Sequence, residues 1–316
     1  MFNLSQKIKK YISLKYNNGI LRIKLKLNKE RINTILETRL AETKNEIKAA
    51  QQLRYRVFYK ELSAHPSILT RFTRRDRDTY DKICQHMLVI DKSNKKRGVL
   101  LIGKKKENVV GTYRLLPQRD AESNKGFYSQ DEYDIKPLIE KHKERKFLEL
   151  GRSCVLNSYR KKSTIELLWQ GVWRYILENN FDVMIGCASF QATEPEKIDM
   201  ALSFLHHYAL APEEWRVKAK ENRYVNMNML KKEEIDKKEA LKIMPPLIKG
   251  YLRLGAYVGD GAVIDKQFGT IDVFIVMPRE LIEKRFVDRF TICILYTSEA
   301  ADDIPCVDLG GRRIIK

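Results

Sequence analysis

Residues 148–164 read LELGRSCVLNSYRKKST, an apolar run that carries Glu149 and Arg152 and ends in a basic cluster. The helical pattern TIELLWQGVWRYILENN follows it directly and covers residues 164–180. Where a strand leads straight into a helix, unpaired backbone N–H groups and the positive end of the helix dipole meet at the junction. The stretch therefore predicts a strand–helix unit with a site for an anion at the start of the helix.

The amino-acid composition is that of a globular and strongly basic protein. With 316 residues, of which 43% are hydrophobic, the chain can bury a core as one large domain or as two small ones. Its formal net charge of +19 and its pI near 9.6 predict attraction to an anionic partner. Nucleic acid, a membrane surface and an acidic carrier protein all fit that description, so charge alone does not choose among them.

The sequence has no run of apolar residues as long as a membrane-spanning helix. Its N-terminal stretch MFNLSQKIKKYISLKYNN also lacks the apolar core of a signal peptide. We therefore expect a cytoplasmic protein, with peripheral contact between its basic surface and the anionic inner face of the membrane.

The C-terminal stretch CILYTSEAADDIPCVDLGGRRIIK (293–316) resembles translated sequencing adapter, and we exclude it from the interpretation of the fold. The alternative is a natural C-terminal extension. The cysteines that remain are Cys84, Cys154 and Cys187, and all three lie in apolar, strand-like runs without metal-type spacing. Such residues are typical of reduced thiols in a core.

The rest of the chain divides into a basic N-terminal arm over residues 1–32 and a folded domain over residues 33–290. In the arm, apolar residues are helix-spaced from Phe2 to Ile12, while ILRIKLKL (20–27) alternates like a strand. Two interpretations stay open: an arm that lies on a membrane surface, and a solvated, poorly ordered terminus.

The domain reads as alternating strands and helices. Thr43 to Glu46 form a capping box that opens a helix. We interpret the glycine-rich part of residues 245–278 as a turn region between a short helix and the last strand. Besides the opening stretch, the expected strands cover residues 32–41, 85–91, 98–104, 109–117, 181–190 and 270–276, and the expected helices cover 44–63, 164–179 and 194–210. This order predicts a single α/β domain in which helices flank a mixed central sheet.

That order of elements is similar to the N-acetyltransferase (GNAT) fold, and a set of motifs between about residues 35 and 285 resembles the ornithine-lipid N-acyltransferase family. The motifs are LRYRVFYKEL (53–62), YDKICQHMLVID (80–91), VVGTYRLLP (109–117), GFYSQDEYD (126–134), LELGRSCVLNSYR (148–160), LLWQGVWRYI (167–176), GCASF (186–190) and PPLIKGYLRLGAYVGDGAVIDKQFGTIDVFIVMP (245–278). The same fold resembles the acyl-homoserine-lactone synthases.

The resemblance implies an enzyme that moves an acyl group, typically 3-hydroxylated, from acyl carrier protein to the α-amino group of L-ornithine. The product would be lyso-ornithine lipid. It also implies that no separate cofactor is needed, because the acyl-phosphopantetheine arrives on the carrier. Transfer to another amino acid such as glycine, or synthesis of an acyl-homoserine-lactone signal, are the enzymatic alternatives.

The chain departs from coenzyme A-binding relatives at the loop after the opening strand. Those relatives have a glycine-rich loop whose N–H groups surround a pyrophosphate. Here the loop is Arg160-Lys161-Lys162-Ser163, without a glycine. Because a carrier-borne phosphopantetheine has one phosphodiester, fewer backbone donors and a few cations can suffice. We expect Val155 and this loop to bind the phosphopantetheine, with backbone N–H groups near Ser153 to Val155 facing the oxyanion.

Amide formation from a thioester also needs a base for the amine proton. Glu149 is the candidate base, with Arg152 as a second catalytic candidate, and the alternative for Glu149 is a structural salt bridge with Arg152 or another arginine. The carboxylate of an amino-acid acceptor favours a bidentate guanidinium, for which Arg54, Arg56, Arg114 and Arg152 are candidates. The acceptor's side-chain ammonium favours an acidic partner. Asp81 is the candidate that we select from Asp76, Asp78, Asp81 and Asp134, all of which fit by type only.

Three further hypotheses receive less support from the sequence. Cys154 or Cys187 as a nucleophile has no basic partner nearby in the sequence. His86, His206 and His207 show no metal spacing, so we expect no metal. Nucleic-acid binding is suggested by charge, but the lysines are spread over turns and helix faces rather than interleaved with aromatic residues.

Overall fold

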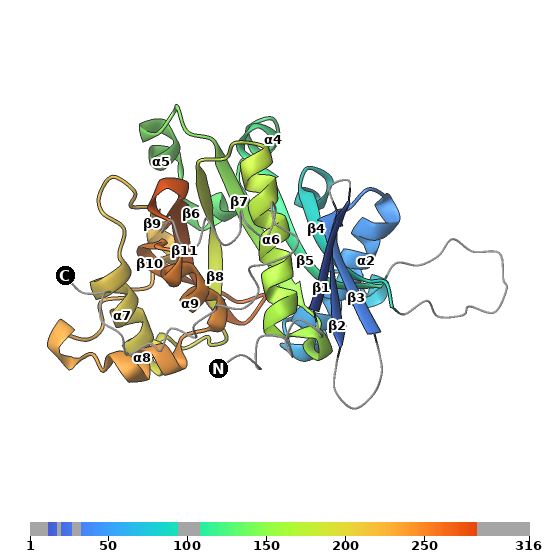
Figure 1. The fold of residues 1–316 in the computed structure, drawn as a ribbon. Coiled ribbons are helices and arrows are strands. Elements are labelled where there is room, and N and C mark those ends of the chain that lie inside the picture. Colours follow the sequence, from blue (N-terminus) through green and yellow to red (C-terminus); the bar gives the residue numbers. More distant parts are fainter. Residues whose placement is uncertain (1–11, 18–19, 27–32, 94–107, 283–316) are drawn as a thin grey trace, which may run out of the picture.

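A computed structural model describes residues 12–17, 20–26, 33–93 and 108–282 of the chain (Figure 1). Its strands are β1 (Ile12–Asn17), β2 (Ile20–Lys26), β3 (Asn33–Leu40), β4 (Gln85–Asp91), β5 (Val109–Pro117), β6 (Tyr133–Asp134), β7 (Phe147–Val155), β8 (Val183–Phe190), β9 (Lys218–Ala219), β10 (Tyr257–Asp265) and β11 (Thr270–Pro278). Its α-helices are α2 (Lys44–Arg54), α3 (Ile68–Thr73), α4 (Gln118–Glu122), α5 (Lys136–Lys141), α6 (Lys162–Glu178), α7 (Asp199–Ala209), α8 (Lys237–Ile243) and α9 (Pro246–Arg253).

Within the described residues the strands form one mixed sheet in the order β1-β2-β3-β4-β5-β7-β8-β11-β10-β9-β6. Neighbours from β1 to β7 are antiparallel, β7 and β8 are parallel, and β8, β11 and β10 are antiparallel again. The parallel pair is joined through α6, the crossover helix expected for such a connection. The α/β fold with a mixed central sheet is therefore confirmed.

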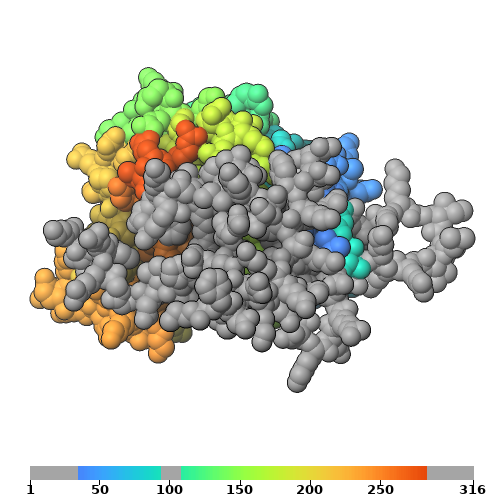
Figure 2. All heavy atoms as spheres, viewed as in Figure 1, coloured from blue at the N-terminus to red at the C-terminus, as the bar shows by residue number. Residues whose placement is uncertain are grey.

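The two faces of the sheet are covered by different helices because successive strand residues point to opposite sides. Met87 and Val89 of β4 pack in one core cluster with α6, which crosses the sheet in the foreground of Figure 1. Leu88 and Ile90, which alternate with them, pack with Ala50 of α2 in another cluster. The space-filling view shows α4, α5 and one end of α6 together at the same edge of the molecule (Figure 2).

Several predicted elements are confirmed at the residue level. Thr43 caps α2 by accepting from the backbone N–H of Glu46, and the Glu46 side chain bonds back to the cap. The strand expected at 20–27 is β2, and the helix expected at 164–179 is α6. The strand expected at 98–104 lies outside the described residues, as do residues 293–316 and most of the arm's helix-spaced positions.

Other expectations were wrong or incomplete. The glycine-rich stretch is mostly a strand, β10, in which the register shifts between Val258 and Ala262 and Gly261 adopts φ +85°. Glycine permits this bulge at a position where a side chain would be strained. The helix expected at 44–63 changes at Tyr55 from an α-helix to a π-helix that runs to Glu61. Ile12, taken as helix-spaced, begins β1, and both β1 and β2 extend the sheet beyond β3.

Candidate active site

The parallel strands β7 and β8 separate in the middle of the sheet. They pair only from Phe147 with Val183 to Glu149 with Ile185. Beyond this point Gly186 has no room for a side chain, because a Cβ there would lie 2.3 Å from the carbonyl oxygen of Leu150. The divergence leaves backbone groups of both strands unpaired with each other, and the opening lies beside Glu149.

On its other side, β7 bulges against β5. Thr112 pairs with Cys154 and Arg114 pairs with Gly151, so two residues, Arg152 and Ser153, oppose a single residue of β5. Arg152 adopts φ +53°, which is unusual for a non-glycine residue and typical of the strained backbone found at functional sites. The bulge changes the direction of β7 three residues after Glu149.

A cavity of about 220 Å³ occupies this opening. It is lined by Glu149, Cys187 and Asp272 from one face of the sheet and by Tyr113 and Ala188 from the other. Because neighbouring positions of a strand point to opposite faces, the cavity passes through the sheet between β7 and β8. A substrate can therefore reach the same point from either side.

Glu149 is buried in this cavity, with 4% of its surface exposed. Its carboxylate accepts from the backbone N–H of Tyr128 at 2.7 Å, from that of Ser129 at 2.8 Å, and from the Ser129 hydroxyl. Burial raises the pKa of Glu149 above its usual value, and the hydrogen bonds from Ser129 and Tyr128 offset only part of the rise. Among the described residues no ion pair joins Glu149 to Arg152 or to another arginine, so the salt bridge considered as an alternative does not form.

Arg152 lies between two aromatic rings. Its guanidinium carbon is 4.8 Å from the ring centre of Tyr128 and 4.5 Å from that of Phe268. Its Nη2 donates to the Tyr128 hydroxyl at 3.0 Å, and longer ion pairs of 3.6 Å reach Asp76 and Asp78. Stacking and loose ion pairing hold the cation at the wall of the cavity without consuming all its donors.

Arg54, by contrast, is fully buried and engaged with aspartates. Its two terminal nitrogens each donate to one oxygen of Asp81 at 2.8 Å, and its Nε lies 2.8 Å from Asp76. Burial alone would raise the pKa of Asp81, but the hydrogen bonds and charge of Arg54 lower it to about 2. The geometry of Arg54 and Asp81 is that of a structural pair.

The remaining predicted acceptor-binding residues are separated from one another. Arg114 is buried at the cavity and its Nη1 donates to both carboxylate oxygens of Asp78 at 2.7 Å. Arg56 has an exposed side chain on the π-helix and does not line the cavity. Asp134 is exposed on β6. Of the predicted set, the fold therefore brings Glu149, Arg152 and Arg114 together.

The basic loop lies where the strand–helix pattern predicts. Lys161 is the N-cap residue of α6, has no capping side chain, and is exposed, as is Lys162, while Ser163 is half-buried. Arg160 has a more structural position, because its Nε donates to the Val155 carbonyl at 2.9 Å and its Nη2 donates to Glu61. The helix N-terminus thus presents backbone N–H groups and two exposed ammonium groups together.

The three cysteines that the structure describes, Cys84, Cys154 and Cys187, are poor nucleophiles at neutral pH. Burial raises the pKa of both the Cys84 and the Cys154 thiol to about 12, and it raises the pKa of Cys187 further. Within the described ranges, the structure has no group of three or more histidine, cysteine or acidic side chains that could hold a metal ion.

The sequence interpretation missed Tyr128 and Ser129 of the cavity wall, Glu132 of an adjoining cavity, and Asp272 of the cavity wall. The first three lie in the segment treated as irregular, whose 3-10 helix (Tyr128–Asp131) supplies the donors to Glu149. Asp272 lies in β11, where an acidic residue interrupts an otherwise apolar run. That interruption was the one available signal, since a buried strand rarely carries a carboxylate without a reason.

Comparison with known proteins identifies relatives of this chain. A family model described as "Acetyltransferase (GNAT) domain" matches residues 53–170. The chain is 48% identical over 260 residues to "L-ornithine N(alpha)-acyltransferase" of Agrobacterium fabrum, covering 82% of this chain and 86% of that protein. It is 49% identical over 255 residues to the protein of the same name from Rhizobium meliloti, covering 81% and 84%.

Solved structures give weaker matches. An N-acyl amino acid synthase from uncultured soil microbes is 11% identical, with a TM-score of 0.43 over 78% of this chain and 92% of that chain. A CoA-dependent acyl-homoserine lactone synthase is 14% identical, with a TM-score of 0.41 over 79% and 83%.

A mixed sheet that opens between two parallel strands, together with the matching domain model, defines an acyltransferase of the GNAT class. Within that class, the chain belongs to the L-ornithine N(alpha)-acyltransferase family. The resemblance read from the motifs and the assignment as an enzyme are both confirmed.

Proposed function

We propose that this chain transfers an acyl group from acyl carrier protein to the α-amino group of L-ornithine and forms lyso-ornithine lipid. The observation that supports this most is the cavity that passes through the sheet at Glu149. One side offers a carboxylate and a guanidinium to an amino acid, and the other leads toward the face covered by α6. The names of the relatives support ornithine as the acceptor.

Glu149 would act as the general base. The neutral α-amine attacks the thioester carbonyl carbon, the C–N bond forms, the C–S bond breaks, and the pantetheine thiolate leaves. The proton lost by the nitrogen passes to Glu149, directly or through water, and then to the thiolate or to solvent. The raised pKa of Glu149 suits this role, because a carboxylate whose pKa is nearer to neutral accepts a proton more readily.

Arg152 would bind the carboxylate of the acceptor. Its guanidinium lines the same cavity as Glu149, and its contacts with Asp76 and Asp78 are long enough at 3.6 Å for a better-placed anion to compete. Arg114 is the second cation at this wall, although Asp78 occupies one of its nitrogens. The aromatic rings of Tyr128 and Phe268 would keep the Arg152 guanidinium in place when the site is empty.

The donor would enter from the side of α6. Lys161 and Lys162 lie at the helix N-terminus and are exposed, as needed for contact with a phosphodiester and with the acidic surface of a carrier protein. A coenzyme A thioester is the alternative donor. The absence of glycine from this loop favours the carrier, because a backbone without glycine has less freedom to wrap closely around a pyrophosphate.

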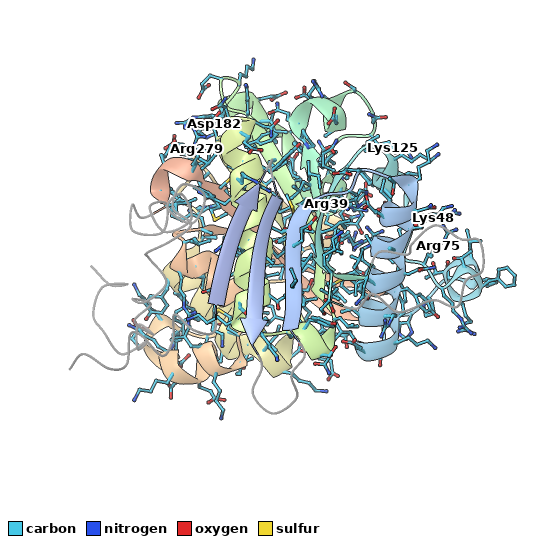
Figure 3. The ribbon with its side chains drawn as sticks, turned by 45° about the vertical axis from the view of Figure 1, so that its right-hand side comes forward. Arg39, Lys48, Arg75, Lys125, Asp182 and Arg279 are labelled. Atoms are coloured by element: carbon cyan, nitrogen blue, oxygen red, sulfur yellow. The ribbon has the colours of Figure 1, made fainter. Side chains whose placement is uncertain are left out.

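We also propose that the enzyme contacts anionic membrane through α3. No helix in the described ranges is long and apolar enough to cross a bilayer. However, Ile68 and Phe72 of α3 are 90% and 87% exposed, and Leu69 is also exposed. Arg71 and Arg74 accompany them, and Figure 3 shows Arg75 at the outer edge, on the same side as Lys48 of α2. Protruding apolar side chains among arginines suit insertion into an anionic lipid surface.

Expression in a bacterium that lacks aminolipids tests the proposed function. Lipid extraction and mass spectrometry should reveal a mono-acylated ornithine, and a strain that expresses Glu149→Gln should lack it. Purified parent enzyme supplied with 3-hydroxyacyl carrier protein should form the same product. Acylated glycine or acylated homoserine lactone instead would establish one of the alternatives, and no product from folded enzyme would contradict the proposal.

A further inference from the structure

Asp272 is a buried carboxylate that the proposed chemistry does not use. It lies on β11 opposite Ser189 of β8, lines the same cavity as Glu149, and has 8% of its surface exposed. Its Oδ1 has no hydrogen-bond partner. In the part of the chain that the structure describes, no lysine or arginine forms an ion pair with it. Burial raises its pKa, and hydrogen bonds from the Ser189 and Thr270 side chains offset part of the rise.

A buried carboxylate without an ion pair is costly, so its presence in a cavity favours a cationic partner that comes from outside. The sequence contains 60 lysines and arginines, yet none of those that the structure describes forms an ion pair with Asp272. Arg54 and Arg114 pair with aspartates, and Arg223 pairs with Glu132 at 3.0 Å. Arg152 lines the same cavity and acts on Asp272 through its charge, but its ion pairs are with Asp76 and Asp78. The missing partner of Asp272 is therefore a cation that the protein itself does not supply.

Two more acidic side chains extend this negative region. Glu132 accepts a weak hydrogen bond from the Cys187 thiol, with 3.7 Å between Oε2 and Sγ. Asp265 lines both the cavity at Glu149 and an adjoining cavity of about 630 Å³ that also contains Glu132. The acidic end of the site is thus continuous with a wider opening through which a polar substrate can enter.

The sheet register sets the spacing between the base and this acidic end. Glu149 pairs with Ile185 of β8, whereas Asp272 pairs with Ser189 of the same strand, and paired residues share a face of the sheet. Their backbones are therefore offset by about 13 Å along the strand, at roughly 3.3 Å per residue. Both carboxylates line the same cavity, so the acceptor lies between them along this offset.

We infer that Asp272, supported by Glu132 and Asp265, is the binding site for the side-chain ammonium of a diamino-acid acceptor. This rests on the proposed function and deepens it: Glu149 receives the α-amine, Arg152 the carboxylate, and Asp272 the distal ammonium. A neutral acceptor such as glycine would leave Asp272 buried and unpaired. The site would therefore select against neutral acceptors by the cost of an unsatisfied carboxylate.

Norvaline provides the sharpest test, because it has the carbon skeleton of ornithine without the distal amine. Initial rates are measured for both acceptors with the parent enzyme and with Asp272→Asn, using 3-hydroxyacyl carrier protein as donor. In the parent, kcat/KM should favour ornithine by roughly 10- to 100-fold, since a hydrogen bond to a charged group contributes about 1.5–3 kcal/mol. In Asp272→Asn the value for ornithine should fall by a similar factor, while that for norvaline should stay level or rise.

The matched control is Asp120→Asn, the same substitution on α4, where Asp120 pairs with the exposed Arg119. It should leave the ratio of the two acceptors unchanged. An equal fall for ornithine and norvaline in Asp272→Asn would show a structural role and overturn the inference. So would a parent enzyme that uses the two acceptors equally well, a result that needs no folded variant. If the parent acylates neither, the proposed function itself is wrong, which is a distinguishable outcome.

Discussion

Ser129 donates both its backbone N–H and its hydroxyl to the same oxygen of Glu149, Oε1. The pair is buried, and these bonds favour the ionised carboxylate while burial opposes it. The segment around Ser129 therefore sets how strong a base Glu149 is.

Ser129→Ala should move the acid limb of the kcat–pH profile to higher pH. Removal of the hydroxyl takes away a bond to the anion, so the pKa of Glu149 rises and less of it is ionised at a given pH. A hydrogen bond to a charged group contributes about 1.5–3 kcal/mol, which corresponds to a shift of roughly one to two pH units. Ser123→Ala removes a hydroxyl that donates to the Arg119 carbonyl on the surface and should not move the limb. If the acid limb of the kcat–pH profile stays in place in Ser129→Ala, Ser129 does not control the pKa of Glu149.

Arg54→Met should destabilise the protein far more than Arg56→Met. Arg54 is fully buried between Asp76 and Asp81, so its removal leaves two buried carboxylates without their cation. Breaking a buried pair in this way costs about 3–5 kcal/mol of unfolding free energy. The exposed Arg56 should change it by less than about 0.5 kcal/mol. Chemical denaturation measures the free energy of unfolding of both variants. A stable Arg54→Met enzyme with a raised KM for ornithine would instead restore Arg54 as an acceptor-binding residue.

Replacement of both Lys161 and Lys162 by alanine should raise the KM for acyl carrier protein and leave the KM for the amino acid nearly unchanged. Both lysines are exposed at the N-terminus of α6, so added salt should weaken carrier use by the parent enzyme steeply and by the variant less. Steady-state kinetics at low and high salt measure how steeply the KM for acyl carrier protein depends on salt in the parent enzyme and in the variant. Parental kinetics in the variant at both salt concentrations would contradict the assignment of this loop to the phosphopantetheine.

Serine at both Ile68 and Phe72 should reduce binding to vesicles of phosphatidylglycerol. Burial of such side chains contributes about 1.5–3 kcal/mol each, so their loss should lower partitioning by at least roughly tenfold. Vesicle sedimentation measures this, with Leu281→Ser as the control because Leu281 is an exposed leucine remote in sequence from α3. Unchanged partitioning with a raised KM for acyl carrier protein would identify α3 as a carrier-docking surface instead.

Much of the fold could be predicted because local patterns and tertiary packing agree. The alternation in ILRIKLKL, the capping box at Thr43 and the apolar stripe of the helix after Arg160 all specify elements that the structure contains. The role of β10 could not be predicted in the same way. Its glycines are typical of turns, and only the pairing with β11 and the approach of β9 keep this stretch in the sheet, with a bulge at Gly261.

The site was predicted in part for a similar reason. Glu149 and Arg152 stand out because charged residues in a buried strand are rare. The partners of Arg54 could not be read from the sequence, since Asp76 and Asp81 lie more than twenty residues away and reach it only through the fold. The bulge at Arg152 depends on the register between β5 and β7, which no local pattern records.

The measurement that tests the central claim most directly is the turnover of Glu149→Gln on 3-hydroxyacyl carrier protein and L-ornithine. Glutamine keeps the size of the side chain and one acceptor oxygen, which can face the two Ser129 donors, but its amide nitrogen cannot accept from Tyr128 and it cannot take up the amine proton. We predict that kcat falls roughly 10²- to 10⁴-fold, while the thermal stability and the affinity for the carrier stay near those of the parent. A loss of less than about threefold across the pH range, or a loss of activity that only follows a loss of stability, would remove Glu149 from the mechanism.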